Sequence, residues 1–159
     1  MTTTSTTYVL AGIDPTVADA LRSRGGIGYV ADDHPGYPCR QCLRDAEIGD
    51  EMILVSHDPF TAWSPYRSAS PIFLHRFACT PYDSAELEVP EQLTRRRLSV
   101  RAFDNSEMML DAALIDGRNL ATTIHDLLDN HDVDHLYIHN EPRGCFAARV
   151  DRHPCQSIA

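Results

Sequence analysis

The spacing of apolar and polar residues predicts a chain built mainly from β-strands. Turn residues separate the apolar runs: three prolines fall within residues 58–71, and the sequence DNSE joins 98–103 to 108–115 as a hairpin turn. Each run has the length of an ordinary strand, about 4 to 8 residues. The predicted strands cover residues 8–13, 27–31, 52–57, 72–79, 98–103, 108–115, 133–140 and 145–150.

Two segments carry helical patterns instead. In the first, the capping residue Asp14 precedes Pro15 at the first helical position, and Gly25 ends the helix. The second begins at Asp116 or Gly117. An apolar stripe at helical spacing follows it: Leu120, Ile124, Leu127 and Leu128. Two main helices far apart in a chain of strands predict an α+β fold with a mostly antiparallel sheet.

The chain of 159 residues has the size of a single domain. We expect this domain to extend from 8 to 152, between a disordered N-terminal end at 1–7 and a short tail at 153–159. Residues 1–7 lack the basic and apolar parts of a signal peptide, and no apolar run approaches the roughly 18 residues of a membrane span. The sequence therefore predicts a cytoplasmic protein with reduced thiols.

The charge of the chain limits its partners. It has 23 acidic residues, 14 arginines, no lysine and a net charge of −9. Negative charge opposes binding to phosphate backbones, so we expect neither a nucleic-acid nor a membrane partner. The absence of lysine also excludes a Schiff-base lysine and a phosphate-loop lysine. The expected partner is a small molecule or a metal ion.

The sequence GYPCRQCLRD at residues 36–45 places Cys39 and Cys42 three positions apart. Such a pair is half of a zinc site, a redox dithiol, a nucleophile with a neighbour, or two buried thiols. Five cysteines, an odd number, exclude a complete set of disulfides within one chain. Zinc takes four Cys or His ligands, so the zinc interpretation requires a second pair elsewhere in the chain.

Two segments offer this second pair. In FLHRFAC, a strand would place His75 and Cys79 roughly 13 Å apart at about 3.3 Å per residue, so only one of them should reach a shared ion. The predicted hairpin of 133–140 with 145–150 offers His139 and Cys145, which face each other if the strands pair in simple register. Its other face is apolar, with Leu136, Ile138, Phe146 and Val150 as expected core residues. The favoured zinc ligands are Cys39, Cys42, His139 and Cys145.

Several stretches of the chain resemble a bacterial family known as the domain of unknown function 1203, DUF1203. They are GYPCR, DAEIGDE, SPYRSASPIF, RAFD with MMLDAALIDG, and YIHNEPRGCFAARVDR, in this order from residue 36 to residue 152. The resemblance implies a single bacterial domain and no particular activity. It directs attention to Cys39, Arg40, His139, Asn140, Gly144, Cys145 and Arg149.

Three functions stay open from the sequence. The first is a module that binds zinc or a small anion, with an anion held by paired N–H donors of arginine. The second is an enzyme for acyl or thiol transfer, with Cys39 or Cys145 as nucleophile and His139 as base. The third is an interaction domain whose cysteines only pack. The candidate anion-binding residues are Arg40, Arg101, Asn140 and Arg149.

Overall fold

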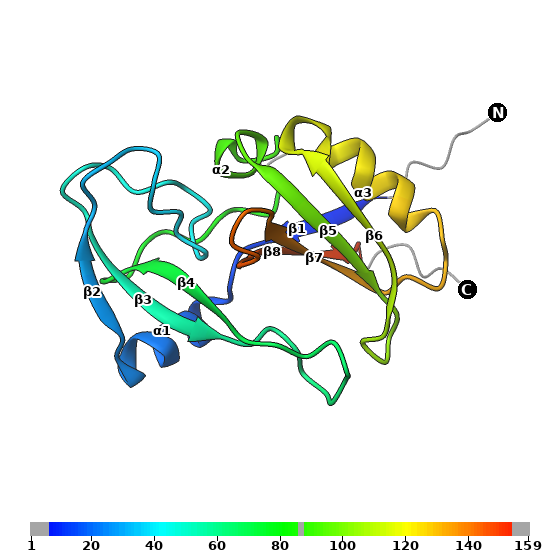
Figure 1. Ribbon diagram of the computed structural model, residues 1–159, viewed down its shortest axis with the longest axis horizontal. Coiled ribbons are helices and arrows are strands. Elements are labelled where there is room, and N and C mark those ends of the chain that lie inside the picture. Colours follow the sequence, from blue (N-terminus) through cyan, green and yellow to red (C-terminus); the bar gives the residue numbers. More distant parts are fainter. Residues whose placement is uncertain (1–6, 86–87, 154–159) are drawn as a thin grey trace.

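The computed structural model describes residues 7–85 and 88–153. Its elements are β1 (Tyr8–Ala11), α1 (Pro15–Arg24), β2 (Ile27–Val30), β3 (Glu51–His57), β4 (Ser70–His75), α2 (Glu91–Thr94), β5 (Arg97–Phe103), β6 (Met109–Asp116), the 3-10 turn η1 (Gly117–Asn119), α3 (Leu120–Leu128), β7 (His135–Asn140) and β8 (Phe146–Arg152) (Figure 1). The predicted ends at 1–7 and 153–159 lie outside the described residues, except for Thr7 and His153.

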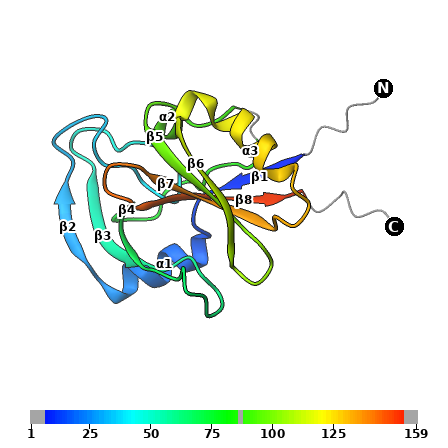
Figure 2. The same ribbon diagram turned by 45° about the vertical axis from the view of Figure 1, so that its right-hand side comes forward.

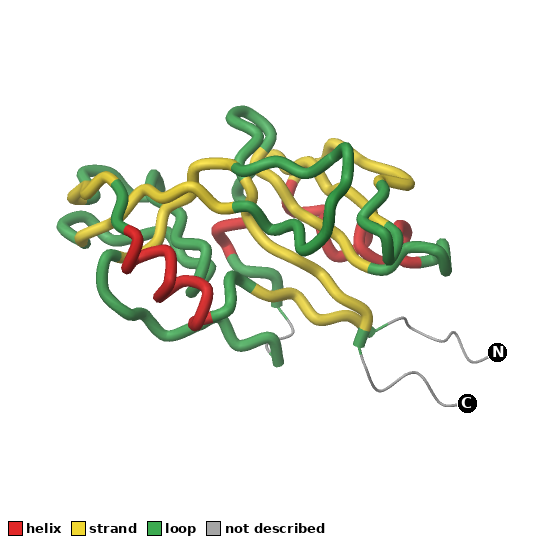
Figure 3. The backbone as a smooth tube through the Cα atoms, turned by 90° about the horizontal axis from the view of Figure 1, so that it is seen from below, coloured by secondary structure: helices red, strands yellow, loops and turns green. Residues whose placement is uncertain are grey.

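The strands form two antiparallel sheets at opposite ends of the molecule (Figure 1, Figure 2). The strand order is β1-β8-β7-β5-β6 in the larger sheet and β2-β3-β4 in the smaller one. The helix α1 contacts β3 of the smaller sheet, and α3 contacts β5 and β6 of the larger sheet (Figure 3). The predicted α+β class is confirmed, and so is the β5–β6 hairpin. Among the described residues, no helix is long and apolar enough to cross a membrane.

The helix α1 begins at Pro15 as predicted, whereas the segment predicted to open the second helix at Asp116 or Gly117 forms the 3-10 turn η1, and α3 itself begins at Leu120. The Thr16 amide donates to Asp14 Oδ1 at 2.8 Å at the start of α1. The Arg118 amide donates to Asp116 Oδ1 at 2.9 Å in the 3-10 turn that leads into α3. These bonds satisfy amides that a helix start leaves without partners. The predicted apolar stripe of α3 is buried: Leu120, Ile124, Leu127 and Leu128.

Two hydrophobic cores cover opposite faces of the larger sheet. The first lies between this sheet and α3, where Ile124 and Ile138 are both buried. The second joins Tyr137 of β7 to buried residues of β3 and β4. Because of this second core, β7 is buried on both faces, and the face that carries His135 and His139 is covered as well.

The hairpin of β7 and β8 forms as predicted, with one difference in register. Ile138 lies opposite Ala148, but His139 lies opposite Phe146, so Ala147 is an extra residue in β8. Such a bulge reverses the faces of the residues beyond it. The prediction that His139 and Cys145 face each other is therefore wrong. The expected core residues of the hairpin are all buried, but not on one face as predicted. Leu136, Ile138 and Val150 lie in the first core, and the bulge turns Phe146 into the second.

Candidate metal centre

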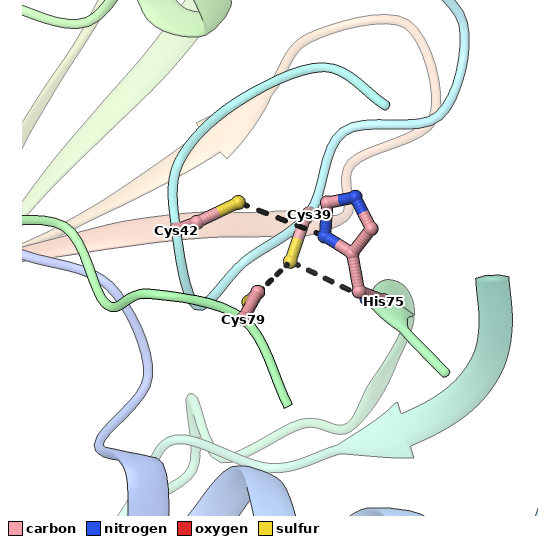
Figure 4. A group of neighbouring side chains, drawn as sticks. All are labelled: Cys39, Cys42, His75 and Cys79. Atoms are coloured by element: carbon pink, nitrogen blue, oxygen red, sulfur yellow. Dashed lines mark hydrogen bonds between the residues drawn. The ribbon is translucent and has the colours of Figure 1, made fainter. Parts of the chain in front are cut away.

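One group of four donor side chains stands out in the part of the chain that the structure describes. The donor atoms of Cys39, Cys42, His75 and Cys79 all lie within 4.8 Å of one another. Figure 4 shows them converging from three segments: the loop after β2, the end of β4, and the loop that follows β4. Three sulfur atoms and one imidazole nitrogen are a ligand set that zinc takes in structural sites.

The cysteine loop turns tightly enough to point both thiols in one direction. The Cys39 amide donates to the Arg44 carbonyl at 3.0 Å and closes the loop. Leu43 adopts a φ of 55°, in the left-handed region that a leucine rarely enters. The Leu43 side chain is buried in the first core, which offsets the cost of this conformation.

His75 and Cys79 come together because the strand ends between them. β4 ends at His75, and the chain then bends, so that Cys79 Sγ lies 3.8 Å from Cys39 Sγ. The prediction that His75 and Cys79 are too far apart to share an ion assumed a straight strand through FLHRFAC. This prediction is wrong, because the strand geometry holds only as far as His75.

The spacing of the donor atoms matches a tetrahedral ion. With a zinc–sulfur distance of about 2.3 Å, two sulfurs on a tetrahedron lie about 3.8 Å apart. The Cys39–Cys79 pair has a sulfur–sulfur distance of 3.8 Å, and Cys42 Sγ lies 3.7 Å from His75 Nδ1. The donors therefore already stand near the corners that an ion of this kind requires.

Asp50 orients the imidazole of this group. Its Oδ2 lies 3.2 Å from His75 Nε2, while His75 Nδ1 faces the thiol of Cys42. A carboxylate on the far nitrogen of a metal-binding histidine fixes the tautomer that leaves the near nitrogen free to bind. The role of Asp50 depends on where the fold places His75, so the sequence around Asp50 carries no signal for it.

Arg22 of α1 ties the surrounding segments together. Its guanidinium donates to the His75 carbonyl at 2.8 Å and to Gln41 Oε1 at 2.6 Å, and lies 4.0 Å from Cys79 Sγ. All three segments of the group thus contact one arginine side chain. A single arginine among 14 carries no signal in the sequence that would reveal this role.

Without a metal, side chains of this group shift one another's pKa values in opposite directions. Hydrogen bonds from Cys42, Cys79 and His75 lower the pKa of the Cys39 thiol, and the bond to Cys39 raises the pKa of Cys42. Hydrogen bonding to Cys39 and Cys79 raises the pKa of His75 to about 10. The arrangement favours a thiolate at Cys39 beside a protonated imidazole, and the thiolate is the form that binds metal.

The other two predicted metal ligands lie outside this group. His139 Nδ1 is 2.9 Å from the Gly144 carbonyl oxygen, and Cys145 Sγ is 3.9 Å from the Arg143 carbonyl oxygen. Burial lowers the pKa of His139 to about 4, with a further contribution from nearby arginines, so its imidazole is neutral. The structure thus joins Cys39 and Cys42 to a different histidine and a different cysteine.

Two of the predicted anion-binding arginines are engaged by the protein itself. Arg40 is buried and donates to the carbonyls of Phe146 at 2.8 Å and Pro38 at 2.6 Å. Arg149 forms a two-point ion pair with Asp151, with both nitrogen–oxygen distances 2.8 Å. These contacts stabilise the fold and occupy most of the donors that an anion would need.

The other two predicted anion-binding residues are less occupied. Arg101 Nε donates to Ser99 Oγ at 3.1 Å, and none of the ion pairs among the described residues involves Arg101. Asn140 Oδ1 is buried without a hydrogen-bond partner in the described part of the chain. Arg101 lies on β5 and Asn140 ends β7, outside the metal centre.

Comparison with known proteins identifies the family. Residues 36–152 match the family described as "Protein of unknown function (DUF1203)", so the chain belongs to it, as its sequence resemblance predicts. No curated protein and no solved structure matches the chain. The matched segment contains all four donors of the candidate metal centre together with Asp50, and Arg22 precedes it.

Proposed function

We propose that this member of the DUF1203 family is a zinc-binding domain whose ion is held by Cys39, Cys42, His75 and Cys79. The observation that carries the proposal is the convergence of these four donor atoms within 4.8 Å. Thiolates select soft ions, and magnesium and calcium prefer oxygen ligands. Three thiols with one imidazole favour zinc among the common divalent ions.

The proposed role of the ion is structural. Four protein ligands complete the tetrahedral shell of zinc and leave no position for a substrate, whereas catalytic zinc sites keep one position open. Cys39 and Cys42 are buried, as expected for an ion that supports a fold.

The ion would link parts of the chain that regular secondary structure does not connect. The cysteine loop contacts the smaller sheet through the Arg40 amide, which donates to the Phe73 carbonyl at 3.0 Å. It contacts α2 through Gln92 Nε2, which donates to the Cys39 carbonyl at 3.0 Å. Zinc at this point would hold the loop against both neighbours, and metal binding would contribute directly to the stability of the fold.

The alternative of an enzyme that uses His139 as its base has less support. A nucleophile and its base need hydrogen-bond contact. The polar contacts of His139 and Cys145 instead go to the main-chain carbonyls of Gly144 and Arg143. We therefore propose metal binding alone.

Metal content tests the proposal. Wild-type protein purified under reducing conditions without chelator should contain about one zinc per chain by mass spectrometry, because the four donors form one site. Cys79→Ser should lose most of this zinc. Cys145→Ser is the matched control, since it removes another thiol that lies outside the group. A wild type that takes up no zinc on reconstitution would contradict the proposal, and so would equal losses in the two variants.

A further inference from the structure

The strand β6 leaves one edge of the larger sheet open. It is the last strand in the order β1-β8-β7-β5-β6 (Figure 2). Two of its apolar side chains are exposed, Leu110 by 43% and Leu114 by 63%. An exposed edge strand with apolar side chains is a template for pairing with another strand. Within β6, lysine, arginine and proline, which often block such pairing, do not occur.

The main chain of β6 has donors and acceptors that point outward. At its end the Gly117 amide donates to the Arg96 carbonyl, 2.8 Å away, so the groups of Gly117 face β5. The main-chain N–H and C=O groups of successive residues point to opposite sides of a strand. The groups of every second residue, counted back from Asp116, therefore face away from β5. The Ala112 amide confirms this, since it donates to the carboxylate of Asp111 at 2.8 Å and not to a strand. The outward set is Ala112, Leu114 and Asp116.

This outward set is complementary to itself. An antiparallel pair of β6 strands with a two-fold axis at Leu114 would place Leu114 against Leu114 of the partner subunit. Ala112 would then lie opposite Asp116 of the partner subunit. All three outward residues would pair in this register, with the Ala112 amide exchanging its bond to the Asp111 carboxylate for a bond to the partner strand. Two carboxylates directly opposite each other would destabilise the pair of strands. In this register, neither Asp111 nor Asp116 faces another carboxylate.

The register also provides an attraction between charges. Arg101 lies opposite Ala112 in the β5–β6 ladder. On that face of the sheet, only the small side chain of Ala112 lies between Arg101 and the open edge of β6. Asp116 of the partner subunit would stand on the same face, just beyond Ala112. Within one chain the Asp116 carboxylate pairs with Arg118 at 2.9 Å, so Arg101 would share this carboxylate with Arg118. Arg101 has no carboxylate partner in the described part of one chain, and this pairing would supply one on each side of the axis.

We propose that the protein forms a homodimer in which β6 pairs with β6 of a second copy about a two-fold axis at Leu114, joining the two larger sheets into one. Two-fold pairing of identical strands is a closed arrangement and does not propagate into fibres. The interface uses none of the metal ligands, so it goes beyond the proposed function, and the two proposals can fail separately.

Sedimentation equilibrium of the 159-residue chain, reconstituted with zinc, tests the dimer. The wild type should have twice the 17.8 kDa mass of one chain. Leu114→Glu would place two carboxylates face to face at the axis and should raise the dimer dissociation constant roughly 100-fold. Leu110→Glu is the matched control, because Leu110 is an exposed leucine of the same strand outside the paired set. It should stay dimeric.

Crosslinking tests the register independently. Leu114→Cys should give covalent dimers with a short bis-maleimide, since the two residues at the axis would have Cα atoms about 5.5 Å apart. Leu110→Cys and the wild type measure the background from more distant and native thiols. A monomeric wild type at about 0.5 mM, a concentration at which even a weak dimer would form, would overturn the proposal. Equal dissociation of both glutamate variants, or crosslinking no stronger for Leu114→Cys than for Leu110→Cys, would also overturn it.

Discussion

Two regions of this protein combine cysteine with histidine, and only one of them brings the donor atoms together. In the proposed zinc site, the sulfurs of Cys39 and Cys79 lie 3.8 Å apart, beside the imidazole of His75. At the end of the β7–β8 hairpin, His139 and Cys145 make their polar contacts with main-chain carbonyls of their own loop. The same residue types are therefore arranged to share an ion in the first region and not in the second.

The backbone explains this contrast. The donors of the proposed zinc site stand on loops and at a strand end, where the chain can turn and point several side chains at one place. His139 stands within a strand that is buried on both faces, and a bulge places Phe146 opposite it. Burial of a histidine near a cysteine therefore does not indicate a site unless the local backbone also directs the two toward each other.

Removing the metal should produce the largest difference between the two regions. Chelation of zinc-loaded wild type should lower the free energy of unfolding by about 4 kcal/mol or more, the effect of free metal at roughly 1,000 times its dissociation constant. Denaturant unfolding with and without chelator measures this loss. Cys145→Ser should show the same loss as wild type, whereas Cys39→Ser should respond little to chelator. If chelator left the free energy of unfolding of the wild type unchanged, the proposed difference between the two regions would be wrong.

The next largest effect concerns His139 and pH. Burial lowers its pKa from 6.5 to about 4, so the unfolded chain binds a proton more readily than the folded one between these values. Stability from this group is complete above pH 6.5 and decreases as the pH falls toward 4, by about 3 kcal/mol in total.

Unfolding free energies of wild type and His139→Asn at about pH 7, above the window, and at about pH 4, its lower end, measure this effect. Asparagine keeps an N–H for the Gly144 carbonyl but does not titrate in this range. The difference between the two proteins should therefore shrink by about 3 kcal/mol on acidification. Zinc release at low pH affects both proteins alike. A constant difference would mean that burial does not keep the His139 imidazole neutral in the folded protein.

The smallest of these effects sharpens the description of the metal centre itself. Asp50→Asn should weaken zinc binding roughly 10- to 100-fold, because the carboxylate that orients His75 becomes an amide, and outer partners of metal ligands have effects of about this size. Competition with a chromogenic chelator measures the affinity. Asp58→Asn is the control, since Asp58 pairs with Arg67 at 2.7 Å and not with a metal ligand. Equal losses in both variants would contradict the role of Asp50.

The local parts of this fold could be predicted from the sequence. The Asp14 cap, the apolar stripe of α3 and the β5–β6 turn all depend on residues close together in the chain. The pair Cys39 and Cys42 could be recognised for the same reason, since their spacing is itself the signal. The other two donors, His75 and Cys79, could not be recognised as their partners. The sequence FLHRFAC is equally compatible with a strand that ends at His75 and one that continues to Cys79.

By itself the sequence determined the fold class, the hairpins, the family and one half of the proposed zinc site, because each of these depends on neighbours in the chain or on a continuous pattern. Only the tertiary structure decided which histidine and cysteine complete the centre. It did so through three features: the bend after β4, the bulge in β8, and the second core that covers β7. All three result from packing between segments far apart in the sequence, where the residues of one segment alone carry no signal about the other.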